Sequence, residues 1–132
     1  MTIYRFDIGA AAMALGLAMP ATAQEIDVPS GAPMTLHEVM LENDPMLARF
    51  RFVSAAIDPA GAGRGFADLV DDLQYLCDQV VIPSLAANDW AGEDVVISVS
   101  SQIAEFGVFD EGITQFFQPY RIADGACVWT DF

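Results

Sequence analysis

The sequence FADLVDDLQYLCDQVV, residues 66–81, decides how this chain folds. Its apolar residues recur at intervals of three and four, so they lie within one arc of a helical wheel, and its acidic residues lie on the opposite side. The pattern predicts one long amphipathic helix that packs on the rest of the chain and is limited by Pro83. The apolar arc contains Phe66, Leu69, Val70, Leu73, Leu76, Cys77 and Val80; the polar arc contains Asp68, Asp71, Asp72, Tyr75 and Asp78.

Two segments before this helix alternate between apolar and polar residues, which is the period of a β-strand. They are residues 35–42 and 47–53, and the turn-forming sequence NDPM separates them. We expect a hairpin with Glu42 opposite Leu47, because this register gives the sheet one apolar and one charged face. It pairs Val39 with Phe50, Leu41 with Ala48, His37 with Phe52 and Glu38 with Arg51, and sets Arg49 between Glu38 and Glu42.

The C-terminal half of the chain adds further strands. The β-branched residues 95–100 predict a central or half-buried strand, and short strands are expected at 103–106 and 126–129. The segment from Asp110 to Tyr120 fits either a short helix capped by Asp110 or an extended chain. Together the patterns predict an α+β domain, in which an antiparallel sheet of about four or five strands packs against the helix.

The first 23 residues resemble a secretory signal peptide. Arg5 precedes a 12-residue apolar run, and the small residues Ala21 and Ala23 suit a signal peptidase, so we expect cleavage between Ala23 and Gln24. The apolar run is shorter than the roughly 20 residues that span a bilayer. An uncleaved N-terminal anchor is the alternative. The expected location is the periplasm or the secreted fraction, without stable membrane insertion after cleavage.

Cleavage leaves 109 residues, of which 24–33 read as an extended lead-in and 34–132 as a single domain. The chain has no lysine, and its formal net charge is −14 with or without residues 1–23. Such a charge repels nucleic acid and anionic membranes. It indicates either an acidic binding surface for cations or simply a surface that keeps the protein dissolved.

The two cysteines, Cys77 and Cys127, predict one disulfide, because an exported domain lies in an oxidising compartment. Buried free thiols and catalytic or metal-binding cysteines are the alternatives. A redox-active pair is usually spaced as CxxC, and the residues near Cys77 are acidic, which disfavours a reactive thiolate. A disulfide between these residues would join the helix to the final strand.

The sequence contains no recognisable catalytic, metal or cofactor motif, so we expect no cofactor. His37 is the only histidine, and we interpret it as part of the hairpin, with a hydrolase-type role beside a carboxylate as the alternative. The acidic turn 88–94 offers oxygen ligands for a weak calcium site but lacks the EF-hand spacing. Aromatic residues late in the chain are interpreted as core, with a pocket lining as the alternative. They are Phe106, Phe109, Phe116, Phe117, Tyr120 and Trp129.

Four stretches resemble a family of small exported alphaproteobacterial proteins that is classed as a domain of unknown function. They are MTLHEVMLE (34–42), ARFRFV (48–53), LQYLCDQVVIPSL (73–85) and residues 95–132, of which the strings around Cys77, TQFF and GACVW are the most specific. Members are sometimes labelled acetolactate synthase. That activity is not expected here, because 109 residues without a diphosphate-binding motif cannot enclose thiamine diphosphate and a substrate. The resemblance implies export and the two-cysteine architecture.

The sequence thus favours a non-enzymatic module that binds another envelope protein or a small ligand. A small envelope enzyme that uses His37, and calcium binding at 88–94, are the alternatives. An exposed apolar patch would support the binding hypothesis.

Overall fold

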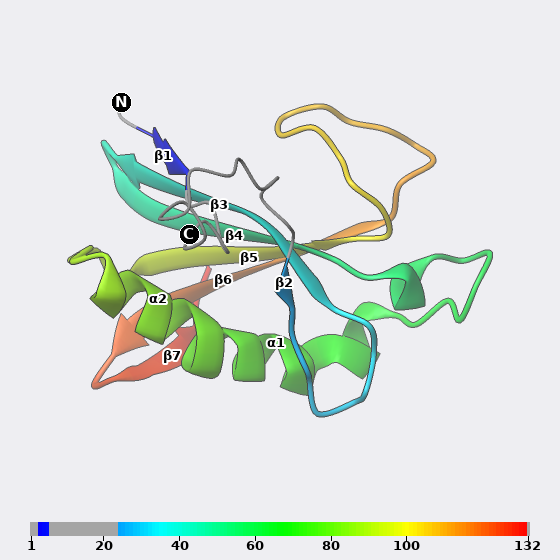
Figure 1. Ribbon diagram of the computed structural model, residues 1–132, viewed down its shortest axis with the longest axis horizontal. Coiled ribbons are helices and arrows are strands. Elements are labelled where there is room, and N and C mark those ends of the chain that lie inside the picture. Colours follow the sequence, from blue (N-terminus) through cyan, green and yellow to red (C-terminus); the bar gives the residue numbers. More distant parts are fainter. Residues whose placement is uncertain (1–2, 6–23, 132) are drawn as a thin grey trace, which may run out of the picture.

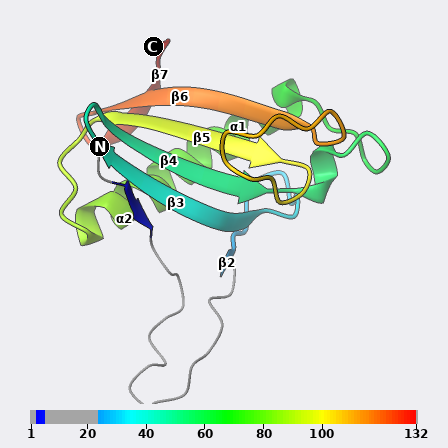
Figure 2. The ribbon, with the colours of Figure 1, turned by 90° about the horizontal axis from the view of Figure 1, so that it is seen from above.

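The amphipathic helix lies across one face of a β-sheet in the computed structural model, which describes residues 3–5 and 24–131 (Figure 1). Viewed from above, the strands form one twisted layer with the helix behind it (Figure 2). The predicted α+β class is therefore confirmed. Within the described residues, no helix is long and apolar enough to span a membrane.

The helix extends further than the sequence predicted, because Pro83 does not end it. It begins as a 3₁₀ turn, and a π-helical turn ends two residues before the proline. The wider π turn removes the clash between a proline ring and the carbonyl group of the preceding turn, which would otherwise kink or break a regular helix. Its consecutive parts are η3 (Phe66–Leu69), α1 (Val70–Leu76), η4 (Cys77–Val81) and α2 (Ile82–Ala87).

The sheet differs from the prediction in size and in strand direction. In the described part of the chain, seven strands fill six positions, in the order β1-β3-β4-β5-β6-β7, because β1 and β2 both pair with β3. Strands β4 and β5 are parallel, and all other pairs are antiparallel. The strands are β1 (Ile3–Arg5), β2 (Gln24–Glu25), β3 (Thr35–Asn43), β4 (Met46–Val53), β5 (Asp94–Ser100), β6 (Gln115–Ala123) and β7 (Ala126–Trp129).

The expectation of four or five antiparallel strands was therefore wrong. The helix carries the chain back across the sheet between β4 and β5, so that β5 runs in the same direction as β4. Strand β1 falls in the segment that the sequence assigns to a signal peptide. The rest of that segment, 1–2 and 6–23, lies outside the described residues, and cleavage after Ala23 stays a prediction.

The predicted hairpin register is correct over most of its length. Glu42 pairs with Leu47, Val39 with Phe50, and Glu38 with Arg51. The pairing fails at His37, because a register shift between Leu36 and Glu38 sets Leu36 opposite Phe52 instead. The expected pairing of His37 with Phe52 was therefore wrong.

A disulfide joins the two layers at the end of the chain. Cys77 in the helix bonds to Cys127 in β7, which confirms the predicted link. Helix side chains also hold the backbone of Cys127: Asp78 accepts its N–H (2.8 Å), and Gln74 donates to its carbonyl oxygen (2.8 Å). These contacts fix the short strand β7 to the helix.

The helical wheel suggested that the whole acidic face of the helix is exposed, but one of its carboxylates is not. Asp72 is buried, with 1% of its surface exposed, and its carboxylate accepts hydrogen bonds from the N–H (2.9 Å) and the hydroxyl of Ser30. The Ser30 hydroxyl also receives a hydrogen bond from Arg64 (3.1 Å). Asp72 therefore anchors the segment 24–33, whose Val28 and Ala32 enter the core.

The segment between β5 and β6 is a long loop. The strand expected at 103–106 is absent, and the chain turns at Asp110, whose side chain accepts the N–H of Gly112 (2.8 Å). The extended alternative for the following residues is correct from Gln115 onward. The carboxylate of Asp110 thus stabilises a local turn instead of the first turn of a helix.

Replacing Asp72 by alanine should lower the free energy of unfolding by about 1–3 kcal/mol, because both donors of Ser30 lose their buried acceptor. Asp71→Ala is the matched control, since it removes the same charge from an exposed neighbour. Urea denaturation measures both variants. Equal stabilities would contradict the anchoring role of Asp72.

Candidate functional site

The face of the sheet that points away from the helix carries the polar and charged residues of the strands, which we call the outer face. Residues 101–114, the loop between β5 and β6, fold over one end of this face (Figures 1 and 2). The base of the loop is closed by two hydrogen bonds between Ser101 and Thr114. The loop therefore covers one end of the outer face, which the helix does not contact.

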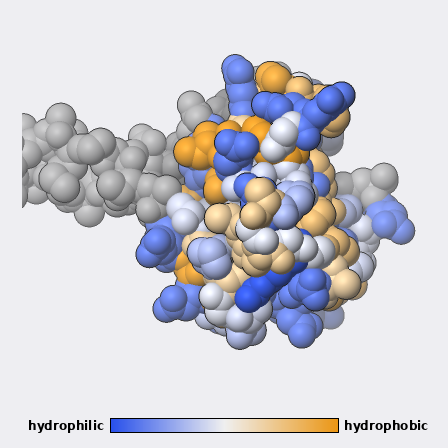
Figure 3. Space-filling view, turned by 90° about the vertical axis from the view of Figure 1, so that its right-hand side faces the viewer, coloured by the Kyte–Doolittle hydropathy of each residue, from blue (hydrophilic) through white to orange (hydrophobic). Residues whose placement is uncertain are grey.

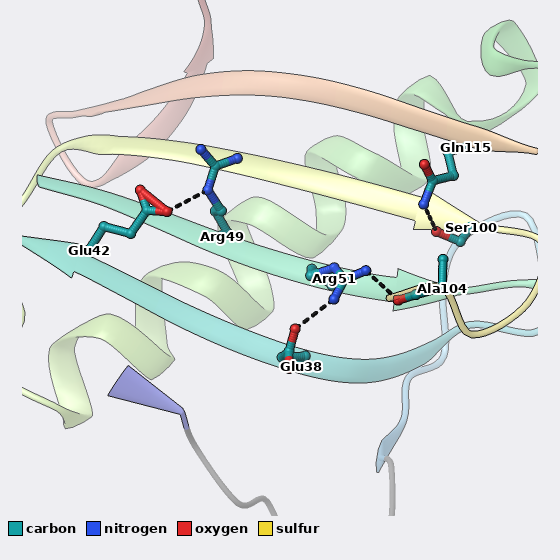
Figure 4. A network of polar contacts seen from close by, with 7 residues as sticks. All are labelled: Glu38, Glu42, Arg49, Arg51, Ser100, Ala104 and Gln115. Carbon is teal, nitrogen blue, oxygen red and sulfur yellow. Dashed lines mark hydrogen bonds and ion pairs between the residues drawn. The ribbon is translucent and has the colours of Figure 1, made fainter. Parts of the chain in front are cut away.

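Arg51 attaches the loop to the sheet. It lies in β4, is nearly buried, and forms an ion pair with Glu38 of β3 (2.6 Å). Its other terminal nitrogen donates a hydrogen bond to the carbonyl oxygen of Ala104 in the loop (2.6 Å), as Figure 4 shows. Because the guanidinium group is planar and has several donors, one side chain binds both partners.

Arg49 and Phe106 extend this contact. Arg49 forms an ion pair with Glu42 (2.8 Å) and lies beside Arg51 on the outer face (Figure 4). The ring of Phe106 covers both guanidinium groups, with its centroid 5.3 Å from Arg49 and 5.5 Å from Arg51. These distances are typical of cation–π contacts, which add to the attachment of the loop. The sequence placed Arg49 between two glutamates, and in the structure its ion pair is with Glu42.

A cavity of about 340 Å³ lies between the loop and the outer face. Its size falls in the range of sites that bind small molecules or partner side chains. Polar groups from three neighbouring strands form its floor, namely Arg49 and Arg51 from β4, Ser98 from β5 and Gln115 from β6. The apolar part of its wall comes from Val96, Phe106, Val108, Phe109 and Phe117.

Large apolar side chains remain exposed around this cavity. Phe109 and Phe117, which line the cavity, are 84% and 58% exposed, and Ile103, which lines a neighbouring hollow together with Phe106, is 68% exposed. Figure 3 looks at the molecule from the loop end, and hydrophobic residues are interleaved with hydrophilic ones in the upper part of this view. We call Ile103, Phe106, Val108, Phe109 and Phe117 the apolar patch.

The aromatic residues that the sequence assigned to the core divide into two groups. Tyr120 is buried, and Phe116 packs against the core on the helix side of the sheet. Phe106, Phe109 and Phe117 are exposed at the cavity, and Trp129 is exposed at the edge strand. The core assignment was therefore wrong for these four. Gly107, with a φ of 79°, and Gly112 mark residues 101–114 as a loop, and that signal could have separated the groups.

His37 lies next to the register shift in β3 and lines a second hollow of the outer face, together with Glu38 and Glu105. A carboxylate is thus near His37, as the enzyme alternative requires. Glu38 is, however, ion-paired with Arg51, and the residues lining this hollow include no serine, threonine or cysteine that could act as a nucleophile. The arrangement provides polar contacts for a ligand and does not form a catalytic triad.

The other candidate residues lie away from the cavity. In the described part of the chain, no three His, Cys, Asp or Glu side chains are placed to hold a metal ion. A calcium site at 88–94 would therefore need main-chain or amide oxygens in addition to carboxylates. Burial raises the pKa of Tyr120 far above its ordinary value, so this phenol stays protonated on the helix side of the sheet.

These features define a class of protein: a small α+β domain whose mixed sheet is covered by a disulfide-linked helix on one face and by a loop over a partly apolar cavity on the other. The chain belongs to DUF6497, a family of unknown function whose profile matches residues 10–132. No curated protein and no solved structure shows a significant match to the chain. The predicted membership in a domain-of-unknown-function family is confirmed, while export and an alphaproteobacterial origin stay predictions.

Replacing Arg51 by methionine should lower the free energy of unfolding by about 3 kcal/mol, because the nearly buried carboxylate of Glu38 would lose its ion pair with Arg51. Arg121→Met removes the same charge from an exposed ion pair with Asp94 and should cost less than about 1 kcal/mol. Urea denaturation gives both values.

Hydrogen exchange provides a second measurement on the same variants. The N–H groups of Val108 and Ile113, which are bonded within the loop, should exchange faster in Arg51→Met than in Arg121→Met. Equal exchange rates in the two variants would contradict the role of Arg51 in attaching the loop.

Proposed function

We propose that this protein is a non-enzymatic binding module of the bacterial envelope, and that the cavity and the apolar patch are its binding site. The observation that carries the proposal is the apolar patch itself, because large apolar side chains gathered at one place on a surface mark interaction sites. Burying these side chains against a partner would gain about 25 cal/mol for each Å² removed from water.

The size of the patch favours a protein partner over a small molecule. The cavity could enclose one aromatic or aliphatic side chain, but Phe109 and Ile103 are too exposed for an occupant of the cavity alone to cover them. Aromatic residues surrounding a pocket are typical of the positions that dominate binding energy at protein interfaces. A partner that places one apolar side chain in the cavity and others on the patch would use the whole site.

The charge of the protein selects the kind of partner. The loop contains Glu105, Asp110 and Glu111 and no basic residue, and Arg49 and Arg51 are both ion-paired to glutamates. The whole chain has a net charge of −14. A segment that carries lysine or arginine next to apolar side chains therefore complements the site, and its association is accelerated by electrostatic attraction.

Export to the periplasm agrees with the signal-like residues 1–23 and with the Cys77–Cys127 disulfide, since disulfides persist in oxidising compartments. This location would bring the module together with envelope proteins. Export with cleavage after Ala23 is part of the proposal. Mass spectrometry of the exported protein tests it, and the mass should correspond to residues 24–132.

Random peptides displayed on phage and selected on the purified protein should be enriched in sequences that combine apolar and basic residues. Phe109→Ser should weaken binding of the selected peptides by tenfold or more, because Phe109 is the most exposed member of the patch and serine removes its apolar ring. Fluorescence polarisation measures the Kd, which should also rise with salt concentration.

Tyr75→Ser is the matched control, since it removes an exposed aromatic ring on the helix, at a distance from the patch. It should leave the Kd unchanged. Selection of acidic peptides, failure to select any peptide, or equal binding by the Phe109→Ser variant would overturn the proposal.

A further inference from the structure

One edge of the sheet is only partly covered. Strand β6 pairs with β5 from Gln115 to Arg121, but on its other side β7 pairs only with Tyr120 to Ala123. Within the described residues, no strand lies beside the first half of β6 on that side. The edge strand at this point is therefore open.

The backbone groups that point out of this edge can be identified from the hydrogen bonds at its two ends. The backbones of Thr114 and Ile122 are hydrogen-bonded to Ser101 and Glu93, which lie just beyond the two ends of β5. The backbone N–H and C=O groups of the even-numbered residues in β6 therefore point toward β5. The backbone groups of the odd-numbered residues point to the opposite side, where the carbonyl oxygen of Pro119 accepts a hydrogen bond from the N–H of Thr130. The N–H and C=O groups of Gln115 and Phe117 consequently point to the open edge.

Proline occupies the position where the open edge meets β7. Pro119 has no N–H, so its position at the edge leaves no donor without a partner. Natural sheets protect open edges with charged residues, proline or a covering loop, because unpaired backbone groups attract other strands. From Gln115 to Gln118 this edge carries no charge, and Phe117 is exposed. The first half of β6 therefore retains the properties of a strand-binding edge.

The open edge is continuous with the cavity. The side chains of Gln115 and Phe117 both line the cavity under the loop. Side chains in a sheet alternate between its faces, so a strand added beside β6 would place every second side chain on the outer face, next to these two residues. Main-chain pairing and insertion of a side chain into the cavity are thus geometrically compatible.

Acidic residues lie close in the sequence to both ends of the open edge. Asp110 and Glu111 precede β6, and exposed Asp131 follows Thr130, which is bonded to Pro119. The charges near the edge match a basic segment and repel an acidic one, including a second copy of this chain. They identify the occupant as a basic segment of another protein.

We propose that the open edge of β6 takes up an extended, basic segment of a partner protein as an additional strand of the sheet. This inference rests on the proposed binding function and specifies how the partner is recognised. Affinity comes from main-chain hydrogen bonds to Gln115 and Phe117, and selectivity comes from the apolar side chains that reach the cavity.

The probe is a blocked eight-residue peptide of alternating lysine and valine, which favours the extended conformation and carries the required charge. Phe117→Ala removes the ring and keeps the N–H, whereas Phe117→Pro removes both. We expect Phe117→Ala to weaken binding several-fold and Phe117→Pro to weaken it at least tenfold further, because only proline removes the edge donor. Fluorescence polarisation measures both effects, and urea denaturation verifies that both variants are folded.

A second measurement does not depend on variants. Adding the peptide to the wild-type protein should slow hydrogen exchange at the Gln115 and Phe117 amides, while a peptide N-methylated at alternate residues should not. Equal binding by Phe117→Ala and Phe117→Pro with unchanged exchange at these amides would overturn strand addition, as would no binding of the alternating peptide. The proposed binding function would still be judged separately, by the effect of Phe109→Ser on selected peptides.

Discussion

A single helix can cover only one face of a sheet, and this constraint determines the organisation of the protein. Residues 24–131 contain one long amphipathic helix, which buries the apolar side of the strands around Phe50, Ile97 and Tyr120. The outer face must therefore be covered differently. It receives the loop 101–114, which Arg51 attaches through Glu38 and Ala104. A loop covers a sheet less completely than a helix does, and the cavity and the apolar patch are the consequence.

Part of the fold could be predicted from the sequence, because it depends on local periodicity. The apolar spacing from Phe66 onward predicted the helix, and strand alternation with matched charges predicted the pairing of Glu38 with Arg51. The disulfide followed from two cysteines, one on the apolar arc and one in the last strand. The helix and the hairpin are specified by residues close in the sequence, whereas the disulfide joins residues 50 positions apart.

The rest of the fold could not be predicted in the same way, because it depends on contacts between distant residues. Parallel pairing of β4 with β5 is set by the direction in which the chain leaves the helix. Burial of Asp72 depends on Ser30, which lies in a different segment. Phe106 and Phe109 were assigned to the core from composition, although they lie in a loop and are exposed in the structure. The cavity arises only when this loop is placed over the sheet.

The central claim is that the outer face under the loop is where this protein meets its partner. Site-specific photo-crosslinking in the native cell tests it most directly, with the photoreactive residue at position 109 or, for comparison, at position 75. The account predicts that the probe at 109 captures one defined partner through a segment rich in basic and apolar residues, and that the probe at 75 does not. Capture of the same protein with equal yield from both positions, or through an acidic segment, would contradict the account.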